Sequence, residues 1–138
     1  MKKVFLITVL FSLFLSTDLF SQSSSIIKNK KITDVKSQLI NFEINQGFQI
    51  ENETNNTISF TKLNTRVLET TVLVLRYGAG EFYDRNRYNF SQLGNDVRIF
   101  YFREVFSSKS NENMSLSTTE DMKKLNQDYL DKFVNSIQ

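Results

Sequence analysis

The segment from Val97 to Phe106 is apolar on both faces, and this feature constrains the fold more than any other. Side chains alternate between the two faces of a β-strand. The two sets are Val97, Ile99, Tyr101 and Val105 on one face, and Phe100, Phe102 and Phe106 on the other. If helices cover one face, the second needs the curled sheet, a ligand or another protein as cover. We expect a strongly curved sheet or helices on opposite faces.

Other segments of the chain also have strand character. Residues 48–52 and 57–61 alternate apolar and polar side chains around Thr54-Asn55-Asn56, which predicts a β-hairpin whose asparagines tolerate positive φ. Val67–Tyr77 is rich in β-branched residues and predicts a long strand. Asn86–Leu93 predicts a strand joined through Gly94-Asn95 to the last one.

Two amphipathic helices flank these strands. The first has apolar residues at Ile32, Val35, Leu39 and Phe42. Thr33 or Asp34 is placed to cap its start, while Gly47 closes its end and Phe48 folds back onto the last turn.

The second helix follows a Ser117-x-x-Glu120 capping box. Its apolar stripe consists of Met122, Leu125, Tyr129, Phe133 and Ile137. The sequence therefore predicts an α+β fold: an N-terminal helix, an antiparallel sheet of four to five strands, and a C-terminal amphipathic helix packed on the sheet.

The N-terminus has the organisation of a secretory signal peptide. Two lysines precede an apolar run over residues 4–15, and a more polar stretch follows to Ser21. We expect cleavage before Gln22, or alternatively after Ser23. The domains are then a signal peptide (1–21), a flexible leader (22–31) and a single α+β domain (32–138). Without cysteine there is no lipoprotein anchor, so we expect an exported periplasmic or secreted protein with no membrane span after cleavage.

The residue inventory excludes several classes of function. Without histidine or cysteine the chain lacks the usual general base, thiol nucleophile and soft-metal ligands. We expect no catalytic residues, no metal and no cofactor. Removal of residues 1–21 leaves 117 of 138 residues, with 15 basic and 14 acidic side chains. This near-neutral balance argues against nucleic-acid binding.

Three carboxylate pairs have structural explanations. Glu51 and Glu53 share one face of a predicted strand and face water. Glu81 and Asp84 fall in a predicted loop. Glu120 and Asp121 suit the positive end of a helix.

Arginines and tyrosines are interleaved in the strand region. The candidate interaction surface consists of Arg76, Tyr83, Arg85, Arg87, Tyr88, Arg98, Tyr101 and Arg103. Guanidinium groups beside aromatic rings hold phosphate, carboxylate or a partner's surface. The interpretation we favour is that the arginines are solvated strand positions, paired with Glu69, Asp84, Asp96 and Glu104.

The chain resembles small exported bacterial proteins of uncharacterised function. The resemblance is carried by the run from Leu39 to Phe60, by Asn86-Arg87-Tyr88-Asn89-Phe90, and by Asp96-Val97-Arg98-Ile99 before a closing helix. The apolar run ending in Phe-Ser-Gln is similar to signal peptides of Bacteroidetes-type bacteria. The resemblance implies a sheet flanked by helices, as in the domains of the outer-membrane assembly lipoprotein BamC, and carries no catalytic residues.

These observations favour a non-enzymatic exported module that binds another envelope or secreted protein. The alternative is a carrier of a small apolar ligand between the sheet and the C-terminal helix. An enzyme that uses carboxylates alone is a third hypothesis. The oligomeric state is left open.

Overall fold

The computed structural model describes residues 23–65, 70–71, 73–75, 78–108, 113–114 and 120–138. In these ranges helices pack on an antiparallel sheet, so the α+β class is confirmed. The predicted signal peptide lies outside the described residues. None of the described helices has the length and apolar character needed to span a membrane.

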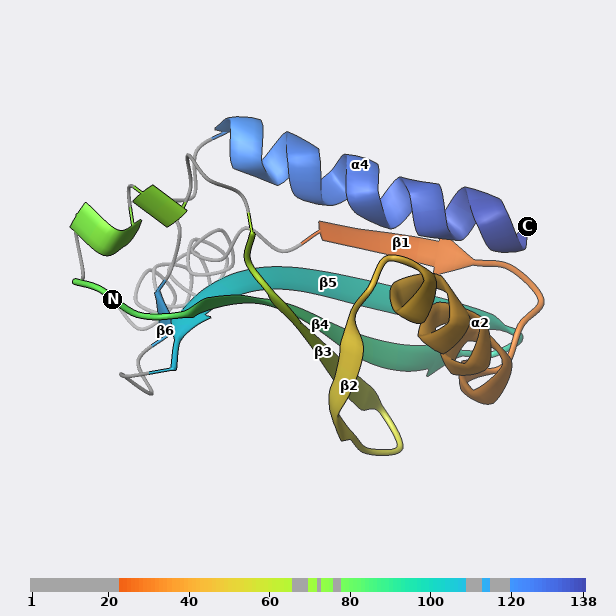
Figure 1. Ribbon diagram of the computed structural model, residues 1–138. Helices are drawn as coiled ribbons and strands as arrows, with labels where there is room; N and C mark the ends of the chain where they lie inside the picture. Colours follow the sequence, from red (N-terminus) through yellow and green to blue (C-terminus); the bar gives the residue numbers. More distant parts are fainter. Residues whose placement is uncertain (1–22, 66–69, 72, 76–77, 109–112, 115–119) are drawn as a thin grey trace, which may run out of the picture.

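Within the described residues the sheet has six strands, all paired antiparallel. Its main path is β1 (Ser23–Ile27), β5 (Asp96–Ser107), β4 (Phe82–Leu93), β3 (Thr57–Leu63) and β2 (Gln49–Glu53), and β6 (Asn113–Met114) pairs with β5. The ribbon shows that the long β4–β5 hairpin is curved, as one of the two alternatives for the sheet requires (Figure 1).

The β4–β5 hairpin turns at Gly94-Asn95 as predicted, with Gly94 at φ +62°. β4 begins at Phe82, four residues before the predicted start at Asn86. The side chain of Gln92 donates to the carbonyl oxygens of Lys30 (3.1 Å) and Gly94 (3.0 Å), and accepts from the backbone N–H of Ile32 (3.2 Å). These bonds hold the start of the first helix against the hairpin.

Residues 23–27 form an edge strand, so the prediction of a flexible leader over 22–31 was wrong. The polar Ser23-Ser24-Ser25 run has no strand pattern of its own, but β5 offers a free edge on which it pairs. Ile27 lies opposite Val97 and is only 1% exposed. Burial of this one isoleucine and the backbone ladder explain the strand. Cleavage after Ser23 would remove the first residue of β1.

The predicted strand over Val67–Tyr77 was also wrong within the described residues, because residues 70–71 and 73–75 are helical. The rest of that segment lies outside the description. Leu73 is buried against Phe82 and Val105 on the sheet, and the Gly78 N–H donates to the Val74 carbonyl at 2.8 Å. Packing of one leucine has overridden a β-branched composition, which is a weak local preference.

The first helix, α2 (Ile32–Asn45), ends as predicted. Gly47 adopts φ +85°, its N–H donates to the Ile44 carbonyl at 2.9 Å, and the Phe48 N–H donates to the Glu43 carbonyl at 3.0 Å. This pair of bonds is a Schellman motif. Its start differs: Lys31 is the N-cap and makes no side-chain cap bond, so neither Thr33 nor Asp34 caps the helix.

The last helix, α4 (Glu120–Ile137), lies alongside β1 (Figure 1). Its buried positions are Asn126, Leu130, Phe133 and Val134. Leu125 is 57% exposed, so the apolar stripe is rotated by about one residue from the predicted one. The acidic first turn is present, whereas Ser117 of the predicted capping box lies outside the described residues.

The β2–β3 hairpin is confirmed, but no positive φ occurs at its asparagines. Instead, Thr54 and Thr57 close the turn through paired hydroxyls at 2.7 Å and a backbone bond at 2.9 Å. A β-bulge between Ile50 and Asn52 changes which face the following residues occupy.

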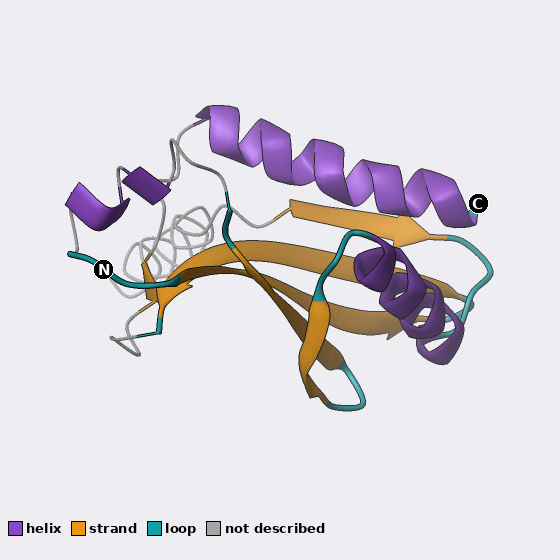
Figure 2. Ribbon diagram, viewed as in Figure 1, coloured by secondary structure: helices purple, strands orange, loops and turns teal. Residues whose placement is uncertain are grey.

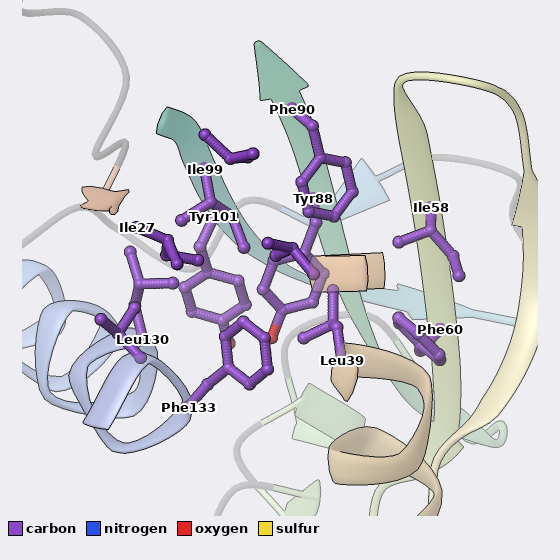
Figure 3. Close-up of a cluster of buried hydrophobic side chains, with 13 residues drawn as sticks. Ile27, Leu39, Ile58, Phe60, Tyr88, Phe90, Ile99, Tyr101, Leu130 and Phe133 are labelled. Atoms are coloured by element: carbon purple, nitrogen blue, oxygen red, sulfur yellow. The ribbon is translucent and has the colours of Figure 1, made fainter. Parts of the chain in front are cut away.

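Both long helices pack on the same face of the sheet. Leu39 of α2 and Phe133 of α4 meet Tyr88 and Tyr101 in one buried cluster (Figure 3). The short helical segment packs on this face too, through Leu73. Helices on opposite faces were therefore a wrong expectation, and none of the described helices covers the second face of the sheet (Figure 2). We call this second face the outer face.

Candidate functional site

The outer face brings together half of the predicted interaction residues. Positions of β4 and β5 alternate between buried side chains under the helices and partly exposed ones on the outer face. The outer-face set consists of Tyr83, Arg85, Arg87, Arg98, Phe100, Phe102, Glu104 and Phe106. Arginines and aromatic rings thus share one continuous surface over two long strands.

Two carboxylates hold Arg85 and Arg87 of this surface. Arg85 pairs with Glu51 of β2, and its second nitrogen lies 3.7 Å from Glu104. Arg87 lies 3.4 Å from the same Glu104 oxygen. The Ser59 hydroxyl also donates to Glu51 at 3.1 Å. The network fixes the guanidinium groups against the strands, so they present a preorganised surface.

Aromatic rings extend the surface towards the open end of the β4–β5 hairpin, opposite the Gly94-Asn95 turn. Tyr83 and Phe106 stack with centroids 5.4 Å apart and planes inclined by 21°. The Arg85 guanidinium carbon lies 4.1 Å from the Phe106 centroid, a cation–π distance. Phe100 and Phe102 remain partly exposed on the same strand.

Three other predicted residues lie on the helix side. Tyr88 is 0% and Tyr101 1% exposed, so neither contributes contact area to an interaction surface, and that part of the prediction was wrong. Arg103 lies on the same side and donates to Asp84 at 2.8 Å. Arg76 lies outside the described residues.

The sequence-based pairing of the arginines is partly confirmed. Glu104 forms ion pairs with Arg85 and Arg87, and Asp84 forms an ion pair with Arg103. Asp96 pairs instead with Lys28 at 2.7 Å, which lowers the pKa of the Asp96 carboxyl. Glu69 lies outside the described residues.

Two expectations for the carboxylate pairs were wrong. Asp84 lies within β4 and is buried, because the strand starts earlier than predicted. The bulge in β2 separates Glu51 from Glu53, so that Glu51 reaches Arg85 on the outer face while Glu53 pairs with Lys36 of α2 at 2.7 Å. Within the described ranges, no three potential metal-ligating residues form a group.

A buried carboxylate on the helix side was not predicted as a functional residue. Glu43 of α2 is 0% exposed and accepts hydrogen bonds from the hydroxyls of Tyr88 and Tyr129 and from the Asn86 amide, the last at 3.1 Å. The Tyr101 hydroxyl donates to the other side of Asn86 at 2.9 Å. The available signal was its position four residues after Leu39, on the core-facing side of the helix.

Burial dominates the electrostatics of this network. Removal from water raises the pKa of the Glu43 carboxyl, and the three donors oppose that shift. Burial and the neighbouring Glu43 raise the pKa of the Tyr88 and Tyr129 phenols, which therefore act as hydrogen-bond donors. The network ties α2 and α4 to β4.

A cleft of about 740 Å³ opens beside this network, between the sheet and α4. Asn86, Tyr101 and Tyr129 belong to both the network and the cleft wall. The charged side chains around the cleft are Lys62, Asp84, Arg103, Asp128, Asp131 and Lys132. We call it the helix-side cleft.

Comparisons with known proteins add no family to this description. No protein-family model matches the chain, and no curated protein matches it. The outer face and the helix-side cleft are therefore the two candidate sites within the described residues.

Proposed function

We propose that the protein is an exported, non-enzymatic module that binds another envelope or secreted protein through the outer face of its sheet. The supporting observation is that Phe100, Phe102 and Phe106 lie beside Arg85 and Arg87 on a face without a described helix over it. Aromatic and arginine side chains are the residues that most often dominate the energy of protein interfaces.

The charge of the outer face supports a protein partner rather than a simple polyanion. Arg85 and Arg87 are balanced by Glu51 and Glu104, so the surface offers both signs of charge around apolar rings. A partner surface would gain affinity by covering the rings, while the ion pairs at the margin would select its orientation.

Export is supported by the charged, apolar and polar order of residues 1–21. The mass of the chain recovered from its exporting host tests this part directly. A chain beginning at Gln22 supports export, and a mass that retains residues 1–21 contradicts it.

Capture experiments test the interaction surface. The substitutions Arg87→Ala and Arg98→Ala together remove two cations from the outer face, and we expect weaker capture of the partner from the exporting host. Lys132→Ala, on the opposite side of the protein, is the matched control and should leave capture unchanged. Equal capture by the wild type, the Arg87→Ala/Arg98→Ala double variant and the Lys132→Ala control would contradict the proposed surface.

The apolar-carrier alternative has less support. Outside the helix-side cleft, the interface between the sheet and α4 is packed with buried side chains such as Ile99, Leu130 and Phe133. The helix-side cleft is rimmed by charged groups, which disfavour an apolar ligand.

A further inference from the structure

We propose that the helix-side cleft binds a neutral, hydroxyl-rich ligand of saccharide size. The proposal is independent of the outer face, because the cleft lies on the opposite side of the sheet. Its volume of about 740 Å³ falls within the size range of small-molecule sites.

The charges of the cleft cancel. Its three cationic side chains and its three carboxylates are Lys62, Arg103, Lys132, Asp84, Asp128 and Asp131. Two of the cations are also engaged locally: Arg103 donates to Asp84 at 2.8 Å, and Lys62 donates to the Gln46 carbonyl at 2.6 Å. An ionic ligand would therefore find no net attraction, whereas a neutral polar ligand would incur no charge penalty.

Planar polar side chains supply the recognition chemistry. Asn135 of α4 is exposed in the cleft wall together with Asp128, while Asn126 of α4 and Asn86 of β4 lie buried beneath the wall, 4% and 1% exposed. A side-chain amide or carboxylate bonds to two groups at once, and neighbouring hydroxyls of a polyol each donate and accept. Phe48 and the exposed Leu125 add apolar surface for the C–H face of a sugar ring.

The floor of the cleft is preorganised by the buried network. Asn86 is held from behind by Glu43 and from the side by Tyr101, at 3.1 and 2.9 Å. Tyr129 is fixed by its bond to Glu43 at 3.2 Å. Groups that are already ordered cost less entropy when a ligand binds.

Saturation-transfer NMR and titration calorimetry with the purified protein test the proposal. The neutral probes are maltose and cellobiose, and the charged comparators are glucose 6-phosphate and glucosamine. We expect a neutral disaccharide to bind, and its affinity to fall about tenfold in Asp128→Ala and in Asn135→Ala. Both positions are exposed, so these variants should keep the wild-type melting temperature. Arg87→Ala, on the outer face, is the control and should bind normally.

Any of four results would overturn the proposal. Three of them are no binding of either neutral disaccharide, stronger binding of a charged comparator, and binding that the Asp128 and Asn135 substitutions leave unchanged. Loss of binding in Arg87→Ala as well would also contradict it, because that residue is remote from the cleft.

Discussion

The phenol hydroxyl of Tyr129 on α4 donates to the buried carboxylate of Glu43 on α2 at 3.2 Å. This bond links the two long helices, which come from opposite ends of the described chain. The same carboxylate binds Asn86 and Tyr88 of β4, so one acidic side chain joins three elements. Hydrogen bonds to a buried, ionisable group contribute more than bonds at the surface.

Tyr129→Phe removes the hydroxyl while keeping the ring, so it tests this link. We expect the free energy of unfolding to fall by about 1–2 kcal/mol, because Glu43 loses a donor in a buried site. Urea denaturation measures the change. Tyr83→Phe is the matched control: its hydroxyl donates to Glu81 at the surface at 2.9 Å, and we expect a loss below about 0.5 kcal/mol. Equal losses would contradict a special role for the buried bond.

Glu43 should make stability depend on pH. Burial raises its pKa in the folded protein, so the folded state keeps a proton that the unfolded state, with a pKa of roughly 4.3, loses earlier. The contribution of Glu43 to the free energy of unfolding is therefore greatest below the unfolded pKa. It declines as the pH rises through the raised pKa of the folded state.

Glu43→Gln removes this titration. Measured by urea denaturation over a pH series, the stability of the variant relative to the wild type should increase as the pH rises above about 4.3. Other titrating groups are shared by both proteins and cancel in the difference. A difference that is constant with pH would show that the Glu43 pKa is unshifted.

Gly47→Ala tests the end of α2. Gly47 has φ +85°, and an added Cβ would also lie 3.3 Å from the Lys62 ammonium nitrogen. The lysine is flexible, so backbone strain dominates, and we expect a loss of about 1 kcal/mol in a thermal or urea unfolding experiment. Gly47→Asn should lose less, because asparagine tolerates this conformation better. A wild-type stability for Gly47→Ala would contradict the observed backbone geometry.

Arg103→Ala tests the ion pair below the helix-side cleft. The Asp84 and Arg103 side chains are 11% and 16% exposed, so removal of the guanidinium leaves a largely buried carboxylate without this cation. We expect a loss of about 2–4 kcal/mol in the free energy of unfolding. Arg98→Ala, at an exposed position, should change stability by less than about 0.5 kcal/mol. If the two variants were equally stable, the pair would have no structural importance.

Much of the sheet and both long helices follow from local sequence patterns. Gly94-Asn95 predicted the β4–β5 turn, and Gly47-Phe48 predicted the end of α2. Both glycines adopt a positive φ, which glycine tolerates better than other residues. The alternation in β5 predicted which side chains lie on each face. These signals act within a few residues, and so they are visible without knowledge of the fold.

The errors arise where tertiary contacts decide. The Ser23–Ile27 strand depends on the free edge of β5, and the helical segment around Leu73 depends on the packing of Leu73 against Phe82 and Val105. Neither of these contacts can be inferred from the residues of the segment itself. Of the residues proposed for the interaction surface, the structure places Tyr83, Arg85, Arg87 and Arg98 on the outer face. Tyr88 and Tyr101 were misplaced because tyrosine serves equally as a core or an interface residue.

Single cysteine reporters give the most direct test of the outer face as an interaction surface, since the chain has no cysteine of its own. Phe102→Cys places a thiol on the outer face, and Lys132→Cys places one on the helix side. Thiol-labelling rates are compared between the purified protein and the protein in its own host. We predict that the thiol at position 102 is labelled more slowly in the host, while the rate at position 132 stays unchanged relative to the purified protein. Equal labelling of position 102 in both settings would contradict a partner on the outer face.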